Sequence, residues 1–179
     1  MTLRLFAAIA VPEEIRAELV RLQKGVPGAR WRPPENFHIT LRFFGEIDER
    51  VAEDLDAELA NIQMASFPLR LKGAGWFGKA DPHALWLGVD TPEPLNWLND
   101  KCERAARRAG LKPEPRKFHP HMTIAYLTGS PVDKVNRFVQ RTADLETEAW
   151  QVTRFSLYSS WITRGAANIY QVEADYPLT

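Results

Sequence analysis

The sequence of 179 residues predicts an α+β fold made of two similar lobes. The first observation is a repeated motif, His-x-Thr followed by an aliphatic residue, which reads HITL at 38–41 and HMTI at 121–124. The second is its spacing, because the two histidines lie 83 residues apart, close to half of the chain. The third is the mixed order of helical stripes and strand-like runs, which favours largely antiparallel sheets.

The chain opens with a strand, a helix and the first motif strand. Residues 3–10 form an apolar run typical of a buried strand. Pro12 then suits the first position of a helix, whose apolar residues recur at helical spacing. The first motif strand is expected over about 37–44, where apolar and polar residues alternate, and Gly45 is expected to end it.

The middle of the chain predicts a helix, a strand pair and another helix. Asp48 can cap the first of these helices. Strands near 67–77 and 84–90 are separated by a glycine-rich turn that suits a hairpin. Pro92 opens the next helix, and Gly110 is its expected end.

The last part predicts the second motif strand, a short helix and three more strands. The motif strand covers about 121–127, and the helix begins near Pro131. The remaining strands are expected near 145–151, 153–160 and 168–175. The order of elements in the two halves is similar, although the two sequences resemble each other only in the motifs.

Composition limits the class of protein. Hydrophobic residues make up 45% of the chain, enough to bury a core, and the formal net charge is zero. Zero charge argues against a protein that coats long nucleic acid, but a small anionic substrate or an RNA end remains possible. Cys102 is the only cysteine, so a reducing compartment fits. No run reaches the ~20 apolar residues of a membrane span. We therefore expect a cytoplasmic, monomeric protein with one domain over 1–179, made of two interleaved lobes.

The motif residues suit the opening of a phosphodiester. One group must remove a proton from the incoming oxygen while another protonates the leaving oxygen, and histidine suits both tasks because its pKa is near 6.5. A threonine two residues along a strand lies about 6–7 Å further on the same face. Its hydroxyl can donate to a phosphate oxygen. A lone His-x-Thr is more often structural, but the duplication favours a catalytic pair, His38 and His121, assisted by Thr40 and Thr123.

The longer matching segments resemble a known family. They are WRPPENFHITLRFFGEI at 31–47, FHPHMTIAYL at 118–127, YQVEADYPL at 170–178 and the opening strand. The chain resembles the 2H phosphoesterase superfamily and, within it, the RNA 2′,3′-cyclic phosphodiesterase family, also called the 2′–5′ RNA ligase family. This resemblance implies a bilobal, pseudo-twofold 2H phosphoesterase fold in which two largely antiparallel sheets flank a central cleft, with helices outside.

The resemblance also implies roles for the motif residues. His38 would protonate the leaving 3′ oxygen, and His121 would activate water. Thr40 and Thr123 would donate hydrogen bonds to the phosphate. The family commonly has arginine just after the second motif, where this chain has Tyr126, which is itself a candidate substrate-binding residue. Arg42, which alternation puts on the same face as His38 and Thr40, is a candidate to supply the missing cation.

Other residues leave alternatives open. Phe118, just before the second motif, could stack on a base or pack beneath the strand. The segment 101–117 holds seven basic and two acidic residues, which could be a solvated surface or a rim that receives RNA. His119 and His121 lack further ligands at metal-binding spacing, so no metal is expected. No nucleotide-binding glycine motif occurs, so no cofactor is expected either.

The resemblance and the motifs together predict metal-independent hydrolysis of RNA 2′,3′-cyclic ends to 2′-phosphomonoesters, with possible reverse 2′–5′ ligation. The substrates would be RNA ends or nucleoside cyclic phosphates. One alternative is a phosphodiesterase that acts on 2′–5′ oligonucleotides or small cyclic nucleotides. Another is a non-catalytic protein that binds RNA ends, in which the absence of the family arginine marks lost chemistry.

Overall fold

The computed structural model describes residues 1–179 and contains ten strands, four α-helices and one short 3-10 helix, η1 (Pro34–Asn36). The strands are β1 (Thr2–Ala10), β2 (Ala29–Trp31), β3 (His38–Asp48), β4 (Phe67–Leu69), β5 (Leu71–Gly78), β6 (Pro82–Val89), β7 (Met122–Leu127), β8 (Trp150–Val152), β9 (Arg154–Trp161) and β10 (Ile169–Pro177). The helices are α1 (Glu13–Val20), α2 (Glu49–Ala60), α3 (Glu93–Arg108) and α4 (Val132–Arg141). The mixture confirms the predicted α+β class.

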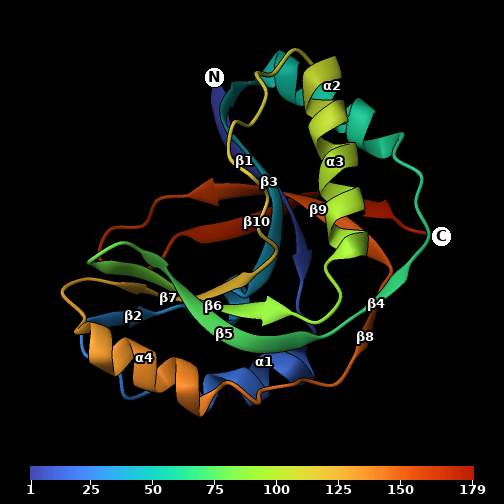
Figure 1. Cartoon of the computed structure of the whole chain (residues 1–179). Helices are drawn as coiled ribbons and strands as arrows, with labels where there is room; N and C mark the ends of the chain where they lie inside the picture. Colours follow the sequence, from blue (N-terminus) through green and yellow to red (C-terminus); the bar gives the residue numbers. More distant parts are fainter.

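Two four-stranded antiparallel sheets form the centre of the molecule (Figure 1). The first has the order β10-β9-β1-β3, and the second has the order β2-β7-β6-β5. The first motif strand, β3, is therefore an edge strand of one sheet, whereas the second, β7, lies between β2 and β6 in the other. Strand β2 from the start of the chain joins the second sheet, and β9 and β10 from its end join the first. Each sheet is thus built from distant parts of the sequence.

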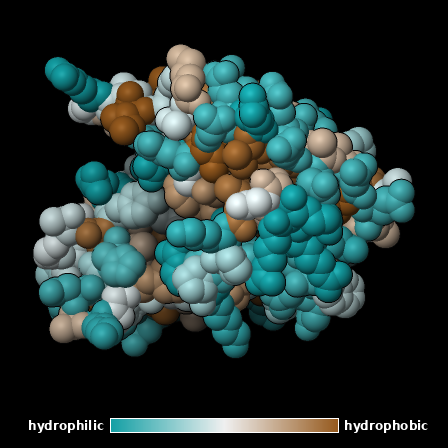
Figure 2. All heavy atoms as spheres, turned by 90° about the horizontal axis from the view of Figure 1, so that it is seen from above, coloured by the Kyte–Doolittle hydropathy of each residue, from teal (hydrophilic) through white to brown (hydrophobic).

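The helices lie on the outside of the two sheets (Figure 1). Seen from above, the surface is mostly hydrophilic, with hydrophobic residues in separate groups (Figure 2). Helix α2 packs against α3, β1 and β3, helix α3 also packs against β3, and α4 packs against β5 and β6. The carboxylate of Asp48 accepts a hydrogen bond of 2.8 Å from the Arg50 amide, which confirms the predicted cap of α2. Gly110, with φ +92°, follows α3 as expected. None of the helices is both long and apolar enough to cross a membrane.

The core holds the motif strands in place by burying the residues that alternate with the motif side chains. Ile39, Leu41, Met122 and Ile124 are all at most 1% exposed and belong to one continuous core cluster. Because successive side chains of a strand point to opposite faces, burial of these four turns the histidine and threonine of each motif to the other face. The hydrophobic pattern therefore sets where the polar motif residues point.

Strand β3 does not end at Gly45, contrary to the sequence prediction, but continues to Asp48. Gly45 has φ +83°, and the pairing of β1 with β3 shifts beside it, from Leu5 opposite Gly45 to Phe6 opposite Phe43. Between these two pairs β3 has one residue more than β1, which makes a β-bulge. Glycine supplies the positive φ that such a bulge needs. Gly45 therefore lies at a bulge within β3 and does not end the strand.

Two other predicted strands have different bounds. The run 67–77 is divided at Arg70, because β4 pairs with β8 in a separate two-stranded sheet while β5 pairs with β6. The run 145–151 is a strand only from Trp150, preceded by an isolated bridge between Lys72 and Glu146. Hydrogen bonds between distant segments set these bounds, and alternation within a single segment does not reveal such partners.

Candidate active site

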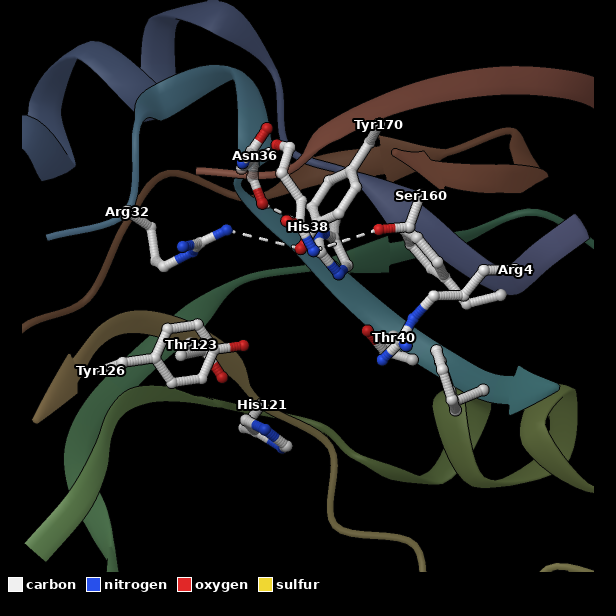
Figure 3. Close-up of a pocket in the computed structure, with 13 residues that line it drawn as sticks. Arg4, Arg32, Asn36, His38, Thr40, His121, Thr123, Tyr126, Ser160 and Tyr170 are labelled. Carbon is white, nitrogen blue, oxygen red and sulfur yellow. Dashed lines mark hydrogen bonds between the residues drawn. The ribbon is translucent and has the colours of Figure 1, made fainter. Parts of the chain in front are cut away.

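A cavity of about 260 Å³ between the two sheets brings the four motif residues together (Figure 3). His38 and Thr40 project into it from β3, and His121 and Thr123 project from the start of β7 on the opposite wall. The remaining lining residues are Arg4, Phe6, Arg32, Asn36, Phe43, Tyr126, Ser160, Asn168 and Tyr170. We call this cavity the main pocket.

Both imidazoles are held in the same way. Nδ1 of His38 lies 2.7 Å from the carbonyl oxygen of Asn36, and Nδ1 of His121 lies 2.5 Å from that of His119. Since a carbonyl oxygen only accepts, each Nδ1 carries the proton and donates it. In the neutral ring this leaves Nε2 without a proton, so it is free to accept one. The repeated contact, two residues upstream of each histidine, reproduces one arrangement in both lobes.

Aromatic rings support each imidazole from the side. The centre of the His38 ring lies 5.0 Å from the ring centre of Phe6 and 5.2 Å from that of Tyr170. The His121 ring meets Phe77 at 4.9 Å and nearly at right angles. These tilted and edge-to-face contacts restrict ring rotation and shield the imidazoles from water. These supporting residues were not predicted, because they come from other strands.

Burial changes the proton affinity of both histidines. It lowers the pKa of His38 to about 4, although the hydrogen bond to the Asn36 carbonyl acts in the opposite direction. It also lowers the pKa of His121, again against the effect of its backbone hydrogen bond, and the neighbouring His119 lowers it slightly further. In the free protein both rings are therefore neutral near pH 7, and an anion in the pocket is needed to favour an imidazolium.

The fixed charges of the main pocket are positive. Arg4 and Arg32 line it, and no aspartate or glutamate does. The Arg32 guanidinium lies 5.0 Å above the ring of Tyr126, and its Nη2 donates to the Tyr170 hydroxyl at 3.4 Å. Arg4 lies 5.1 Å above the ring of Phe43. Two guanidiniums without a carboxylate suit an anion such as a phosphate.

Neither arginine was predicted from the sequence. Arg4 lies between Leu3 and the buried Leu5 in β1, two residues before Phe6, so a charged residue in an otherwise apolar strand was the available signal. Arg32 gave no such signal. Its position depends on the pairing of β2 with β7, which sets Arg30 opposite Tyr126 and Trp31 opposite Ala125.

Arg42 does not share the face of His38 and Thr40, and this part of the sequence prediction is wrong. The pairing of β1 with β3 shifts from Ala7 opposite Arg42 to Ala8 opposite Thr40, which leaves Leu41 as an extra residue. A bulge of this kind reverses the alternation beyond it. Phe43 consequently lines the main pocket, while Arg42 is turned away from it.

Arg42 is instead a buried structural residue. It is 7% exposed, and its Nε donates to the Glu103 carboxylate on α3 at 2.6 Å. Its two remaining nitrogens donate to the backbone carbonyls of Phe43 and Lys112, at 2.7 and 2.8 Å. The guanidinium therefore connects β3, α3 and the segment after α3.

The other two predicted binding residues occupy different pockets. Tyr126, 39% exposed, lines the main pocket beneath Arg32. Phe118 is partly buried against the core and lines a neighbouring pocket, not the main one. The structure brings together no group of three or more histidine, cysteine, aspartate or glutamate side chains suited to a metal ion.

Comparison with known proteins gives a consistent result. The model of the LigT-like phosphoesterase family matches residues 9–86 and again 87–166, one match for each half. A protein of Aeropyrum pernix named RNA 2′,3′-cyclic phosphodiesterase is 35% identical over 78% of this chain and 83% of its own. A protein of the same name from Thermotoga maritima is 33% identical over 90% of this chain and 88% of its own.

Solved structures agree with the sequence matches. Escherichia coli LigT in its apo form superposes with a TM-score of 0.82 at 29% identity, covering 99% of this chain and 98% of its own. The complex of the same protein with 3′-AMP gives a TM-score of 0.81 at 28% identity, over 100% and 99% of the two chains. The predicted resemblance and bilobal fold are confirmed, and this chain belongs to the LigT-like phosphoesterase family of the 2H superfamily.

Proposed function

We propose that this chain hydrolyses RNA 2′,3′-cyclic phosphodiester ends to 2′-phosphomonoesters without a metal ion. The observation that carries this proposal is a pair of imidazoles on opposite walls of one cationic pocket. Each imidazole is held through its Nδ1, which leaves Nε2 free. Relatives of this family carry the name RNA 2′,3′-cyclic phosphodiesterase, and a structural relative binds 3′-AMP.

The proposed reaction is one in-line displacement. Neutral His121 takes a proton from water through Nε2, and the water oxygen forms a bond to phosphorus. The bond from phosphorus to the 3′ oxygen breaks, and protonated His38 gives its proton to that oxygen. The 2′ oxygen remains on phosphorus, so the product is a 2′-phosphomonoester. Thr40 and Thr123 donate to the phosphate oxygens, where negative charge increases in the transition state.

The two pocket arginines take the role first assigned to Arg42. Tyr126 occupies the position at which the family commonly has arginine. The Arg32 guanidinium lies over the Tyr126 ring, so this wall of the main pocket still carries a guanidinium. This supports an enzyme over a non-catalytic RNA-end binder.

The same pocket is compatible with small cyclic nucleotides and 2′–5′ oligonucleotides as second substrates. A 5′-hydroxyl in place of water would give 2′–5′ ligation, with hydrolysis dominant because water is more abundant. Cytoplasmic location, a monomeric state and a single domain of two interleaved lobes stay predictions.

Activity is expected to survive chelation. Two imidazoles suffice to transfer both protons, so turnover of a nucleoside 2′,3′-cyclic phosphate should be the same with and without EDTA. The measurement is the initial rate after dialysis against EDTA, with and without added Mg²⁺, Mn²⁺ or Zn²⁺. Loss of turnover in EDTA that a divalent ion restores would show that the two-histidine reaction is wrong.

The dependence of kcat/KM on pH should be a bell that peaks below pH 6.5. This parameter reports the free enzyme, in which burial lowers the pKa of His38 to about 4 and also lowers that of His121. A bound phosphate anion favours both imidazoliums and raises their pKa values, so the profile of kcat should lie at higher pH. Both profiles come from initial rates between pH 4 and 9. A kcat/KM profile that rises steadily past pH 7 would contradict the assignment.

A further inference from the structure

A second cavity of about 350 Å³ adjoins the main pocket, and we call it the side pocket. The two cavities share Thr40, Phe43 and His121, whereas His38 lines the main pocket alone. The side pocket therefore continues the site at the end where His121 lies. Its further lining includes two aromatic residues, Phe77 and Phe118, and two exposed basic residues, Arg116 and Lys117.

The walls of the side pocket carry aromatic rings from both lobes. Phe43, 37% exposed, comes from β3, while Phe77 comes from β5 and Phe118 from the segment before β7. The Phe43 side chain stands between the two cavities, since it lines both. Flat apolar rings of this kind are the surfaces on which proteins stack unpaired nucleobases.

The charges at this pocket leave a cation available. Arg42 is neutralised by Glu103, and Arg116 pairs with Glu114 at 3.0 Å. The Arg116 side chain is 79% exposed, so its ion pair is weak and a phosphate can compete for the guanidinium. Lys117 is exposed and has no carboxylate within ion-pair distance. A pocket with stacking surfaces and a free ammonium group has the parts needed to bind a nucleotide.

The basic segment 101–117 thereby separates into two parts. On α3, Arg104 pairs with Asp100, Arg107 with Glu103 and Arg108 with Glu58, so these charges serve the helix surface. Beyond the helix, Arg116 and Lys117 lie at the side pocket. The arginines of α3 thus fit the prediction of a solvated surface, whereas Arg116 and Lys117 fit the prediction of a rim that receives RNA.

We propose that the side pocket binds a second nucleotide of RNA, with its base against Phe43 and Phe118 and its phosphate at Arg116 and Lys117. The proposal rests on the proposed function and adds that an RNA chain is a better substrate than a mononucleotide. This nucleotide has two sources. It either precedes the cyclic end in the same chain, or it carries the 5′-hydroxyl that replaces water beside His121 during 2′–5′ joining.

The test compares kcat/KM for a dinucleotide with a 2′,3′-cyclic end with that for a nucleoside 2′,3′-cyclic phosphate. The wild-type ratio should be about tenfold or more, the effect expected of one stacked base. The double variant Arg116→Ala/Lys117→Ala and the variant Phe118→Leu should each bring this ratio close to one. The matched control is Arg104→Ala/Arg137→Ala, which removes two exposed positive charges away from both pockets and should keep the wild-type ratio.

The outcomes separate the two sources. A reduced ratio in the side-pocket variants assigns the pocket to the nucleotide that precedes the cyclic end. An unchanged ratio, with loss of 2′–5′ joined product from a 5′-hydroxyl dinucleotide, assigns it to the incoming nucleotide. If neither quantity changes, the proposal is wrong.

A binding measurement distinguishes failure of this inference from failure of the proposed function. Calorimetric titration with a dinucleotide that ends in a 2′-phosphate needs no turnover, and its Kd should rise about tenfold in the side-pocket variants but not in the control. Absence of turnover on the nucleoside cyclic phosphate would reject the proposed function alone. An equal Kd in wild type and variants would reject the side pocket as the site of the nucleotide that precedes the cyclic end. Together with an unchanged yield of 2′–5′ joined product, it would reject the side pocket altogether.

Discussion

Replacing either His38 or His121 with alanine is expected to lower kcat/KM for a nucleoside 2′,3′-cyclic phosphate by about a hundredfold to ten-thousandfold, the usual contribution of a general acid or base. Both side chains line the main pocket, and each has its Nδ1 engaged by a backbone carbonyl, so Nε2 is the nitrogen available to the substrate. The double variant should lose less than the product of the two single losses, because the acid and the base act in one step.

The control for both variants is His83→Ala. His83 is exposed and lines neither pocket, although its ring lies 6.5 Å from that of Phe77, which supports His121. It should fold and keep nearly wild-type kcat/KM. Circular dichroism of all variants checks the fold. Nearly wild-type rates in either His38→Ala or His121→Ala, with the fold intact, would remove that histidine from the reaction.

The parts of the site that could be predicted are those that depend on the alternation of apolar and polar residues within one strand. In each motif strand buried aliphatic residues alternate with histidine and threonine, and the core keeps this phase, with Ile39 and Met122 fully buried. The duplication at half the chain length also indicated two lobes. A pattern of period two can be recognised without knowing the partner strand, and within each motif the structure keeps it.

The parts that could not be predicted depend on pairing between distant strands. The extra residue at Leu41 appears only in the register of β1 with β3, and it moves Arg42 off the face that alternation assigned to it. Arg32 reaches the pocket because β2, a three-residue strand, pairs with β7 almost a hundred residues later. The Asn36 and His119 carbonyls that hold the imidazoles are backbone atoms, so residue type carries no signal for them.

The corrected position of Arg42 leads to the second large effect, on stability. Arg42→Ala is expected to lower the free energy of unfolding by about 3 kcal/mol, because removing one partner of a buried ion pair leaves the other without compensation. The side chains of Arg42 and Glu103 are only 6% and 16% exposed. Burial alone would raise the pKa of Glu103, but hydrogen bonds from Arg42 and from the Glu114 amide outweigh it, and that pKa is lowered. Two backbone carbonyls also lose their donors.

Arg32→Ala is the matched comparison, since it also removes a guanidinium but from the wall of the main pocket. It should lower kcat/KM by about tenfold or more, roughly 1.4 kcal/mol of transition-state binding, with little change in the urea midpoint of unfolding. Arg42→Ala should do the reverse, with a clearly lower midpoint and, at temperatures where it is folded, kcat/KM within about threefold of wild type. If Arg42→Ala kept wild-type stability and lost tenfold in activity, Arg42 would belong to the phosphate site after all, and the bulge at Leu41 would not turn Arg42 away from the main pocket in solution.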